Sequence, residues 1–536
     1  MLNPSVRDDS ECLISFVTPL FNPPLTPLLE CVERLVEQMC QEVEWVLVDD
    51  GSDDLDFLEK LRKALDGSRY QLELLRKNVG IGRATNHGIR NARGRYIAFL
   101  DQDDLLSPDA VSVVREYLKR DSSIDILYSD ENKISNDGIF YDDFKKPDWS
   151  PERLRHQNYI SHLSVIRKSL IEEAGYLSET LDGAQDHDLL LKCSELSKVV
   201  THIPRVLYHW RAVETSTAFD PDSKRYASDA AVRSVQDHLD RVGIPGIATR
   251  MGNTYVNIDR ALDDSGFTSI VIPTRGTISR LAGYELNLVE NCLESIFQKS
   301  NHANIEVVVV IDSQGLGELE PVISRYSGDA LKVVEYSKDF NFSEKVNLGF
   351  VHTVGDVVIA LNDDTQIITD DWVRKLRVYF NEPDVAVVGP KLLFPDGLIQ
   401  SAGHFYSDGP QHVAAGVKSE AQGPFGILSF PSERSGLTFA CVAIRRTVYD
   451  QVGGLDEGFP RAFNDVDFGE KCSAMGYRMI WTPEVSLYHF ESLSRDPAVE
   501  PFEVNRLYQR WSSIMDGPDR FLPNYWNQHY GISSSW

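Results

Sequence analysis

The chain contains one ordered series of acidic and imidazole residues twice, and this repeat limits the possible folds more than any other feature. The first series consists of Asp49, Asp101, Asp103, Asp186 and His209. The second consists of Asp312, Asn362, Asp364, Asp465 and His489. The order is the same, and the spacing between counterparts changes little. Because the second series follows the first at a distance of roughly half the chain, the sequence predicts two copies of one domain, each with its own site.

Apolar runs alternate with helical patterns in both halves. In the first half we expect strands at 13–21, 44–49, 72–76, 96–100 and 124–128, with helices at 25–39, 54–65, 83–92 and 108–119. In the second half the expected strands are 267–273, 305–312, 331–336 and 357–361, and the helices are 285–298, 316–326, 343–352 and 371–380. Near-continuous apolar runs such as VEWVLV are typical of parallel strands covered on both faces. The pattern predicts an α/β fold with two Rossmann-like, doubly wound, mostly parallel sheets in tandem.

The length of 536 residues is enough for two full cores. We place the first domain at 1–242 and the second at 267–495. The join at 243–266 is not rich in glycine and serine, so we expect an ordered connector and a definite packing of the two domains. Residues 496–536 are aromatic-rich and interrupted by proline, and we treat them as a C-terminal appendage.

The formal charge of −27 argues against nucleic acid or an anionic membrane as a non-specific partner. If the substrate is itself an anion, a positive group must be recruited to the site. A divalent cation held by the site carboxylates would meet that need.

The seven cysteines form no CxxC pair and are odd in number, which favours free thiols in a reducing compartment. No apolar stretch approaches the roughly 20 residues that span a bilayer. The segment 1–11 is polar and acidic, unlike a secretory signal. We therefore expect a cytoplasmic protein.

Polar side chains gather where the predicted strands end. They are Asp49, Asp50, Asp101 and Asp103 in the first half, and Asp312, Asn362, Asp363 and Asp364 in the second. Ligands of open α/β sheets bind beyond the carboxyl ends of the strands. Carboxylates close together there repel one another unless a cation or ligand compensates. Capping of the following helices is the alternative role for such aspartates.

Several segments resemble one enzyme family. EWVLVDDGSDD, GRYIAFLDQDDLLSPDA and DGAQDHDLLLKCSE in the first half, and ALNDDTQIITDDWV and AFNDVDFGEKCSAMGYRMIWTP in the second, resemble the family-2 inverting glycosyltransferases, whose fold is called GT-A. Their order resembles that of the tandem, two-domain glycosyltransferases of bacterial O-antigen and surface-polysaccharide assembly, which are rhamnosyltransferase-like. The resemblance covers nearly the whole chain.

The resemblance implies nucleotide-sugar and metal roles for the strand-end residues. Asp49 and Asp312 match the position that reads the nucleotide base, a suitable task for a carboxylate that accepts from a base N–H. Asp103 and Asp364 match the metal ligand of the DxD motif, with Asp101 and Asn362 at its first position, and Asp50 and Asp363 complete the nucleotide-sugar set. His209 and His489 match an additional metal ligand. Oxygen and imidazole donors suit Mn²⁺ or Mg²⁺.

Asp186 and Asp465 match the family's catalytic base, which takes a proton from the acceptor hydroxyl. Asp188 and Asp467, two residues further along, are rival candidates, and a helix cap is compatible with either role. Arg83, at the start of the helix after NVGIG, can approach the diphosphate, although a solvated arginine is an equal alternative.

The resemblance implies a bifunctional enzyme with one transfer reaction per domain. The donors would be dTDP-, UDP- or GDP-linked sugars, and the acceptor a lipid-linked glycan reached from the inner face of the membrane, with 521–536 as a candidate contact. The first domain has DDGS where the second has DSQG, and this difference suggests that the two domains have different functions. One alternative keeps a single domain active and makes the other a glycan-binding or scaffolding module. A sugar nucleotidyltransferase would need a Gly-rich basic loop, which TPLFNPP and IPTRGTI do not supply.

Overall fold

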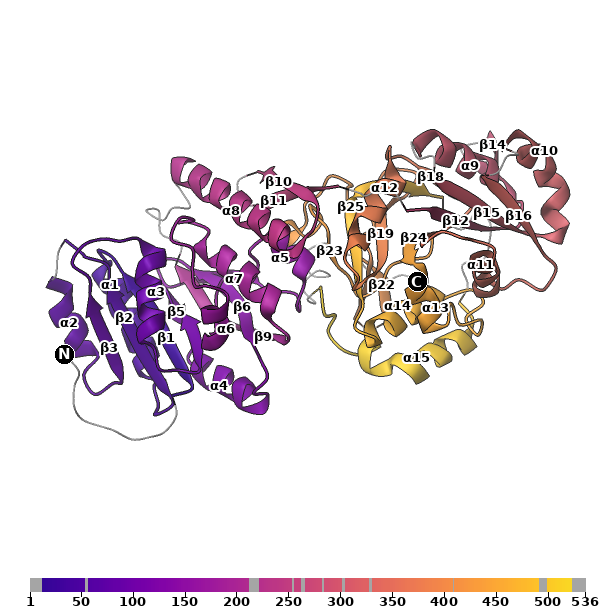
Figure 1. Cartoon of the computed structure of the whole chain (residues 1–536). Coiled ribbons are helices and arrows are strands. Elements are labelled where there is room, and N and C mark those ends of the chain that lie inside the picture. Colours follow the sequence, from indigo (N-terminus) through magenta and orange to yellow (C-terminus); the bar gives the residue numbers. More distant parts are fainter. Residues whose placement is uncertain are drawn as a thin grey trace. The chain divides into compact units, whose positions relative to one another are not determined.

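The computed structural model describes residues 12–522 except 54–55, 212–220, 253–254, 262–265, 282–283, 301–303, 327–329, 408 and 491–498. The chain forms two compact units, Met1–Asp259 and Arg260–Trp536 (Figure 1). The division falls inside the segment 243–266. Each unit is described by itself.

The described part of the first unit is built on one twisted sheet of nine strands. Its order is β3 (Tyr70–Leu74), β2 (Val43–Asp49), β1 (Ile14–Leu20), β4 (Tyr96–Phe99), β8 (Ser164–Arg167), β6 (Ile126–Ile134), β9 (Val200–Arg211) and β5 (Leu105–Leu106), with β7 (Phe140–Phe144) paired to β6. Strands β3, β2, β1 and β4 are parallel, whereas β8 is antiparallel to both of its neighbours. The carboxyl ends of β2 and β4 therefore open on the same edge of the sheet.

Helices cover both faces of this sheet. They are α1 (Leu25–Val36), α2 (Asp56–Ala64), α3 (Ile81–Asn91), α4 (Ala110–Arg120), α5 (Pro151–His156), α6 (Lys168–Glu173), α7 (Gln185–Leu196) and α8 (Pro221–Val242). The core between them is apolar and includes Phe16, Trp45 and Tyr208. A short antiparallel pair, β10 (Gly246–Met251) and β11 (Tyr255–Arg260), follows α8.

The second unit repeats the strand order of the first. Its sheet runs β16 (Leu331–Tyr336), β15 (Ile305–Asp312), β12 (Thr268–Thr274), β17 (Val357–Leu361), β24 (Cys441–Arg445), β19 (Val385–Leu393), β25 (Arg478–His489) and β18 (Thr365–Ile367), with β20 (Ile399–Ser401) on β19 and β23 (Ser432–Glu433) on β25. Again the first four strands are parallel and the fifth, β24, is antiparallel. The expected α/β class with two doubly wound, mostly parallel sheets is confirmed.

The helices of the second unit are α9 (Leu288–Lys299), α10 (Leu316–Tyr326), α11 (Phe342–Val351), α12 (Trp372–Arg377), α13 (Arg446–Val452), α14 (Asn464–Ala474) and α15 (Pro501–Met515). Two hairpins are added, β13 (Ile278–Leu281) with β14 (Tyr284–Asn287) and β21 (His404–Tyr406) with β22 (Pro410–His412). Helix α15, from the C-terminal appendage, packs through Leu507 and Met515 on Tyr406, Phe459 and Val466.

Two glycines show how closely the units correspond. A Cβ at Gly88 in α3 would lie 2.6 Å from Cγ1 of Val17, and one at Gly349 in α11 would lie 2.3 Å from Cγ1 of Val271. In both units a helix without a side chain at this point can approach the central strand. Because the two glycines are equivalent, Lys345 of α11 takes the place of Ala84 in α3.

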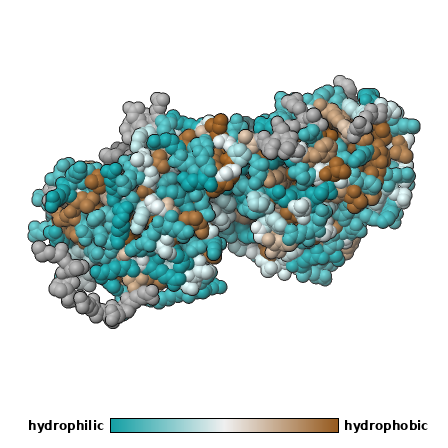
Figure 2. Space-filling model, viewed as in Figure 1, coloured by the Kyte–Doolittle hydropathy of each residue, from teal (hydrophilic) through white to brown (hydrophobic). Residues whose placement is uncertain are grey.

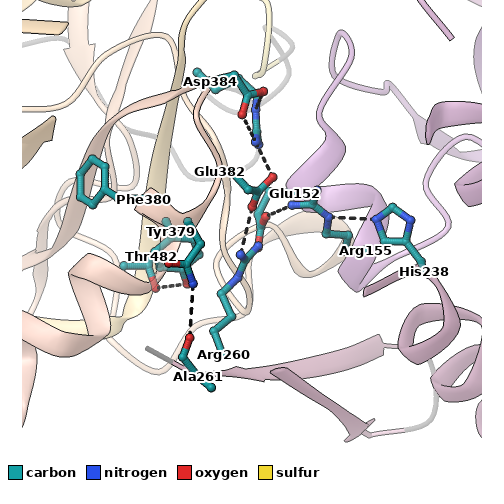
Figure 3. Close-up of polar contacts among 12 residues, drawn as sticks. Glu152, Arg155, His238, Arg260, Ala261, Tyr379, Phe380, Glu382, Asp384 and Thr482 are labelled. Carbon is teal, nitrogen blue, oxygen red and sulfur yellow. Dashed lines mark hydrogen bonds and ion pairs between the residues drawn. The ribbon is translucent and has the colours of Figure 1, made fainter. Parts of the chain in front are cut away.

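Each unit also buries a cluster of charged side chains, parts of which Figure 3 shows. In the first unit Arg155 donates to Glu152 at 2.7 Å and to His238 at 3.2 Å. In the second, Arg260 donates to Glu382 at 3.0 Å. These charges are tolerated in the interior because they are paired.

The face seen in Figure 2 is mainly hydrophilic, with apolar residues scattered in small groups. No helix in the described part of the chain combines the length and the apolar character needed to cross a bilayer. The residues 523–536 of the expected membrane contact lie outside the described residues.

Candidate active sites

In the first unit, the two aspartates that follow the strand β2 are buried and bonded locally. The Asp49 carboxylate accepts from the Ser52 hydroxyl at 2.6 Å and from the Ser52 N–H at 3.3 Å. The Asp50 carboxylate accepts from the N–H groups of Val79 and Gly80 at 2.8 and 3.0 Å. Asp50 therefore holds the loop after β2 against the start of α3, which keeps the candidate base-reading residue in place.

The turn after β4 gathers donors that suit a cation. Ligand atoms of Asp101, Asp104 and His162 all lie within 4.8 Å of one another. The sequence analysis did not single out His162, which precedes β8. The structure brings it to the site because β8 pairs antiparallel with β4. The residue before such a strand falls at the carboxyl end of its partner.

Negative charge is concentrated at this turn. Burial raises the pKa of Asp103, and the neighbouring Asp101 raises it further. Asp104 is buried and accepts from the Tyr208 hydroxyl at 2.5 Å. Arg211 donates to the backbone carbonyl of Asp103 at 2.8 Å. Carboxylates packed this closely favour a bound cation.

His209 on β9 has a fixed ring. Its Nδ1 lies 2.6 Å from Oδ1 of Asn132, whose own Nδ2 donates to Asp143. Since Oδ1 only accepts, the imidazole Nδ1 carries the proton and Nε2 carries the lone pair. Burial, with a smaller contribution from the charge of Arg34, lowers the pKa of His209 to about 4. The ring is therefore neutral, as a metal ligand requires.

In the second unit, Asp312 at the end of β15 has a cationic partner. Its Oδ1 accepts from Lys345 Nζ at 2.6 Å, and Arg275 Nε lies 3.8 Å from its Oδ2. Lys345 is buried and also donates to the carbonyl of Thr274 at 2.5 Å. Burial lowers the pKa of Lys345, while Asp312 raises it. The two base-reading candidates thus differ, because a serine caps Asp49 and a lysine contacts Asp312.

The turn after β17 brings the predicted metal residues of the second unit together. His489 Nε2 lies 3.2 Å from Oδ1 of Asp364 and 3.5 Å from Nδ2 of Asn362. His489 Nδ1 lies 2.7 Å from the amide oxygen of Gln400, which fixes the ring as Asn132 does for His209. Asp363 accepts from the Thr274 hydroxyl, and burial followed by the charge of Asp364 raises the pKa of Asp363 to about 7.

The two candidate bases begin equivalent helices. Asp186 in the first turn of α7 accepts from Asn158 Nδ2 at 2.9 Å and from the next backbone N–H at 2.8 Å. Asp465 in the first turn of α14 accepts from the next N–H at 2.9 Å, and its Oδ2 lies 3.9 Å from His404 Nε2. Both side chains are partly accessible.

The rival aspartates are buried in structural contacts. Asp188 pairs with Lys192 at 2.9 Å. Asp467 accepts from Arg510 at 2.5 Å and from Trp511 Nε1 at 3.0 Å, which ties α14 to α15. Because these contacts leave the carboxylates of Asp188 and Asp467 inaccessible to an acceptor, they favour Asp186 and Asp465 as the bases.

We expect Asp467→Ala to lower the free energy of unfolding by roughly 2 kcal/mol, because the side chain is buried while Arg510 is partly exposed and can be rehydrated. Urea unfolding followed by circular dichroism measures the loss, with the exposed Asp450→Ala as control. Loss of transfer by a variant of unchanged stability would instead make Asp467 a catalytic residue.

A short segment connects base and metal candidates in each unit. In the first, Asn158 donates to Asp186, and His162 Nε2 lies 3.9 Å from Asp101. In the second, the connection runs through the segment 400–412, from Gln400 beside His489 to His404 beside Asp465. In each unit, one segment of the chain thus contacts both the candidate base and a candidate metal residue.

Arg83 makes a surface ion pair in this structure. Its Nε donates to Glu179 at 2.9 Å, and both side chains are about half exposed, at 53% and 43%. Contact with a diphosphate would require Arg83 to leave Glu179.

Acidic strand ends on a doubly wound sheet define an α/β enzyme with its site at the carboxyl edge. The model of the family described as "Glycosyl transferase family 2" matches residues 15–175 and 269–453. The chain belongs to this family, as expected from the sequence, and contains two GT-A units in tandem.

Relatives extend over both units. The chain is 34% identical to "Uncharacterized protein y4gI" of Sinorhizobium fredii, over 96% of this chain and 57% of that protein. It is 29% identical to the "O-antigen biosynthesis protein RfbC" of Myxococcus xanthus, over 98% of this chain and 40% of that protein. The chain thus spans about half the length of these relatives, or less. A solved structure of GalNAc-T7 with UDP, GalNAc and Mn²⁺ is 16% identical with a TM-score of 0.38, covering 49% of this chain and 51% of that chain.

Proposed function

We propose that the chain is a bifunctional, metal-dependent, inverting glycosyltransferase that makes one transfer in each unit to a growing bacterial surface glycan. The observation that carries the proposal is the repeated site. Each unit has acidic residues at its strand ends, an imidazole whose ring is held by an amide oxygen, and a partly accessible aspartate at the start of a helix. Similarity to an O-antigen biosynthesis protein over nearly the whole chain supports the glycan product.

Asp186 and Asp465 act as general bases in this proposal. Each takes the proton of an acceptor hydroxyl as that oxygen attacks the anomeric carbon of the donor sugar. The bond to the nucleoside diphosphate breaks in the same step, so the anomeric configuration inverts and no covalent nucleophile is needed. The N–H that follows each aspartate holds one carboxylate oxygen, which orients the side chain.

The donor sets fit Mn²⁺ or Mg²⁺. In the second unit Asp364 and His489 would hold the ion, with Asn362 beside them. In the first unit Asp103 and His209 are the counterparts, while the closest group of donor atoms belongs to Asp101, Asp104 and His162. A bound ion supplies positive charge opposite the departing diphosphate.

The two base-reading positions support different donors for the two units. Asp49 with its serine cap presents a carboxylate to a base N–H. At Asp312 part of that charge is neutralised by Lys345. We propose nucleotide-sugar donors of the dTDP, UDP or GDP type and a lipid-linked acceptor, with the enzyme acting at the inner face of the cytoplasmic membrane.

A panel of nucleotide sugars with Mn²⁺ tests the proposal through thermal unfolding. A donor at about 100 times its Kd stabilises the native state by about 2.7 kcal/mol, because it binds N and not U. We expect Asp49→Asn to remove the response to one donor and Asp312→Asn to remove the response to another. If every donor response survives Asp312→Asn, the second unit is better explained as a glycan-binding or scaffolding module.

A further inference from the structure

The second unit contains a cavity that the transfer chemistry does not use. It has a volume of about 380 Å³ and lies between α14, α15 and the turn at 517–520, the C-terminal parts that Figure 1 shows in orange and yellow. Tyr406 of β21 also lines it. The cavity therefore depends on residues 511–520 of the appendage, which precede the expected membrane contact at 521–536.

Two buried polar side chains in the cavity wall lack partners. Glu470 and Tyr406 are each 1% exposed. Among the described residues, Oε1 of Glu470 and the hydroxyl of Tyr406 have no hydrogen-bond partner. A buried polar atom without a partner destabilises the folded state, because its hydrogen bonds to water are lost and not replaced. A ligand that both donates and accepts hydrogen bonds would remove that cost.

The other residues that line the cavity indicate which class of ligand fits it. The Asp519 carboxyl and the Glu470 carboxyl disfavour an anion, and Arg520 disfavours a cation. Among the described residues, the cluster of three carboxylate or imidazole donors within 4.8 Å of one another lies in the other unit, away from this cavity. Trp511 adds an apolar ring surface, which suits the C–H face of a sugar. A neutral sugar ring, whose hydroxyls donate and accept, fits all of these features.

Side chains of the cavity wall lie near the candidate base of the second unit. Glu470 and Asp465 lie on the same helix, α14. His404 and Tyr406 are two residues apart on β21, so their side chains point to the same face. A Cβ added at Gly436 would lie 2.3 Å from the Tyr406 hydroxyl and 3.1 Å from His404 Nδ1, so both side chains converge on one space. His404 in turn lies 3.9 Å from Asp465.

We propose that this cavity binds a neutral sugar residue of the acceptor glycan and so positions the acceptor for the second unit. The proposal rests on the proposed function. Residues from the appendage thus contribute to acceptor recognition, and the helix α14 carries the base at its start and a sugar contact further along.

Saturation-transfer NMR on the full chain tests the cavity directly. The probes are the methyl glycosides of L-rhamnose, D-glucose, D-galactose and N-acetyl-D-glucosamine. We expect at least one probe to bind, and Tyr406→Phe and Glu470→Gln each to raise its Kd about tenfold, the effect of one lost hydrogen bond to a buried polar group. Tyr141→Phe in the first unit and the exposed Glu420→Gln are the matched controls.

Two results would overturn the proposal. One is that none of the four glycosides binds the wild-type chain at any soluble concentration. The other is that both variants bind as the controls do, with thermal unfolding showing that they are folded. Glycoside binding requires neither donor nor turnover, so it tests the cavity independently of the proposed function. A failure of the proposed function would appear in a different experiment, as unchanged linkages in the products of Asp465→Asn. In the transfer assay, Glu470→Gln should raise the KM for the acceptor about tenfold.

Discussion

Replacing Asp465 with asparagine is expected to slow the transfer made by the second unit by about 10² to 10⁴ while the linkage made by the first unit persists. That range is what a positioned general base contributes. Asparagine keeps the size of the side chain and still accepts from the following N–H, which lies 2.9 Å from Oδ1 in the native chain. It cannot take the proton of the acceptor hydroxyl. We therefore expect kcat to decrease and the KM for the donor to stay nearly unchanged.

Asp186→Asn is the corresponding experiment for the first unit. Products made from a mixture of donors are separated and their linkages assigned by NMR. Each variant should lack one linkage, and the double variant should lack both. Thermal unfolding of both variants checks that the chain is folded, and Asp450→Asn, on an exposed face of α13, serves as control. A single variant that keeps every linkage would remove its unit from catalysis.

The sequence predicts the parallel half of each sheet well, because apolar periodicity is strongest there. The expected bounds of β16, β17 and α10 agree with the structure at both ends. The antiparallel strand β8 and the strand β9, which runs parallel to β6, were not predicted. β8 has only four residues, and β9 mixes polar with apolar positions because it is only partly covered. The predicted helix at 371–380 ends early as α12 and continues as a 3₁₀ turn, Val378–Asn381.

In the candidate sites, too, some features can be predicted from the sequence and others cannot. Acidic strand ends follow from the sheet topology, but partners from distant strands do not. The contact of His489 with Asp364 depends on β18 pairing with β25, where Thr365 lies opposite His489. Lys345 could be expected at the surface, since a buried lysine needs a partner that only the folded chain supplies. Nothing in the sequence marks Glu470 either, because its partnerless carboxylate exists only once α15 covers α14.

The proposed metal site of the second unit gives the other large expected effect. Asp364→Asn should abolish transfer by that unit at every Mn²⁺ concentration, because a neutral amide replaces the anionic oxygen beside His489 Nε2, 3.2 Å away. Gln400→Leu should act differently. Gln400 contacts the other ring nitrogen, Nδ1, at 2.7 Å, so its loss leaves the donor atoms in place and frees the ring to turn. Removing such an orienting partner typically weakens metal affinity by about 10- to 100-fold.

A Mn²⁺ titration of the linkage made by the second unit separates these two roles. Gln400→Leu should need about 10 to 100 times more Mn²⁺ for half-maximal rate and recover the wild-type rate at saturation. Asp364→Asn should not recover at any concentration, and the exposed Gln422→Leu should titrate as the wild type does. The linkage made by the first unit is an internal control in every sample, because His209 is oriented by Asn132 instead. If Gln400→Leu loses maximal rate with no change in its Mn²⁺ requirement, the Gln400–His489 contact shapes the acceptor side of the site and His489 is not a metal ligand.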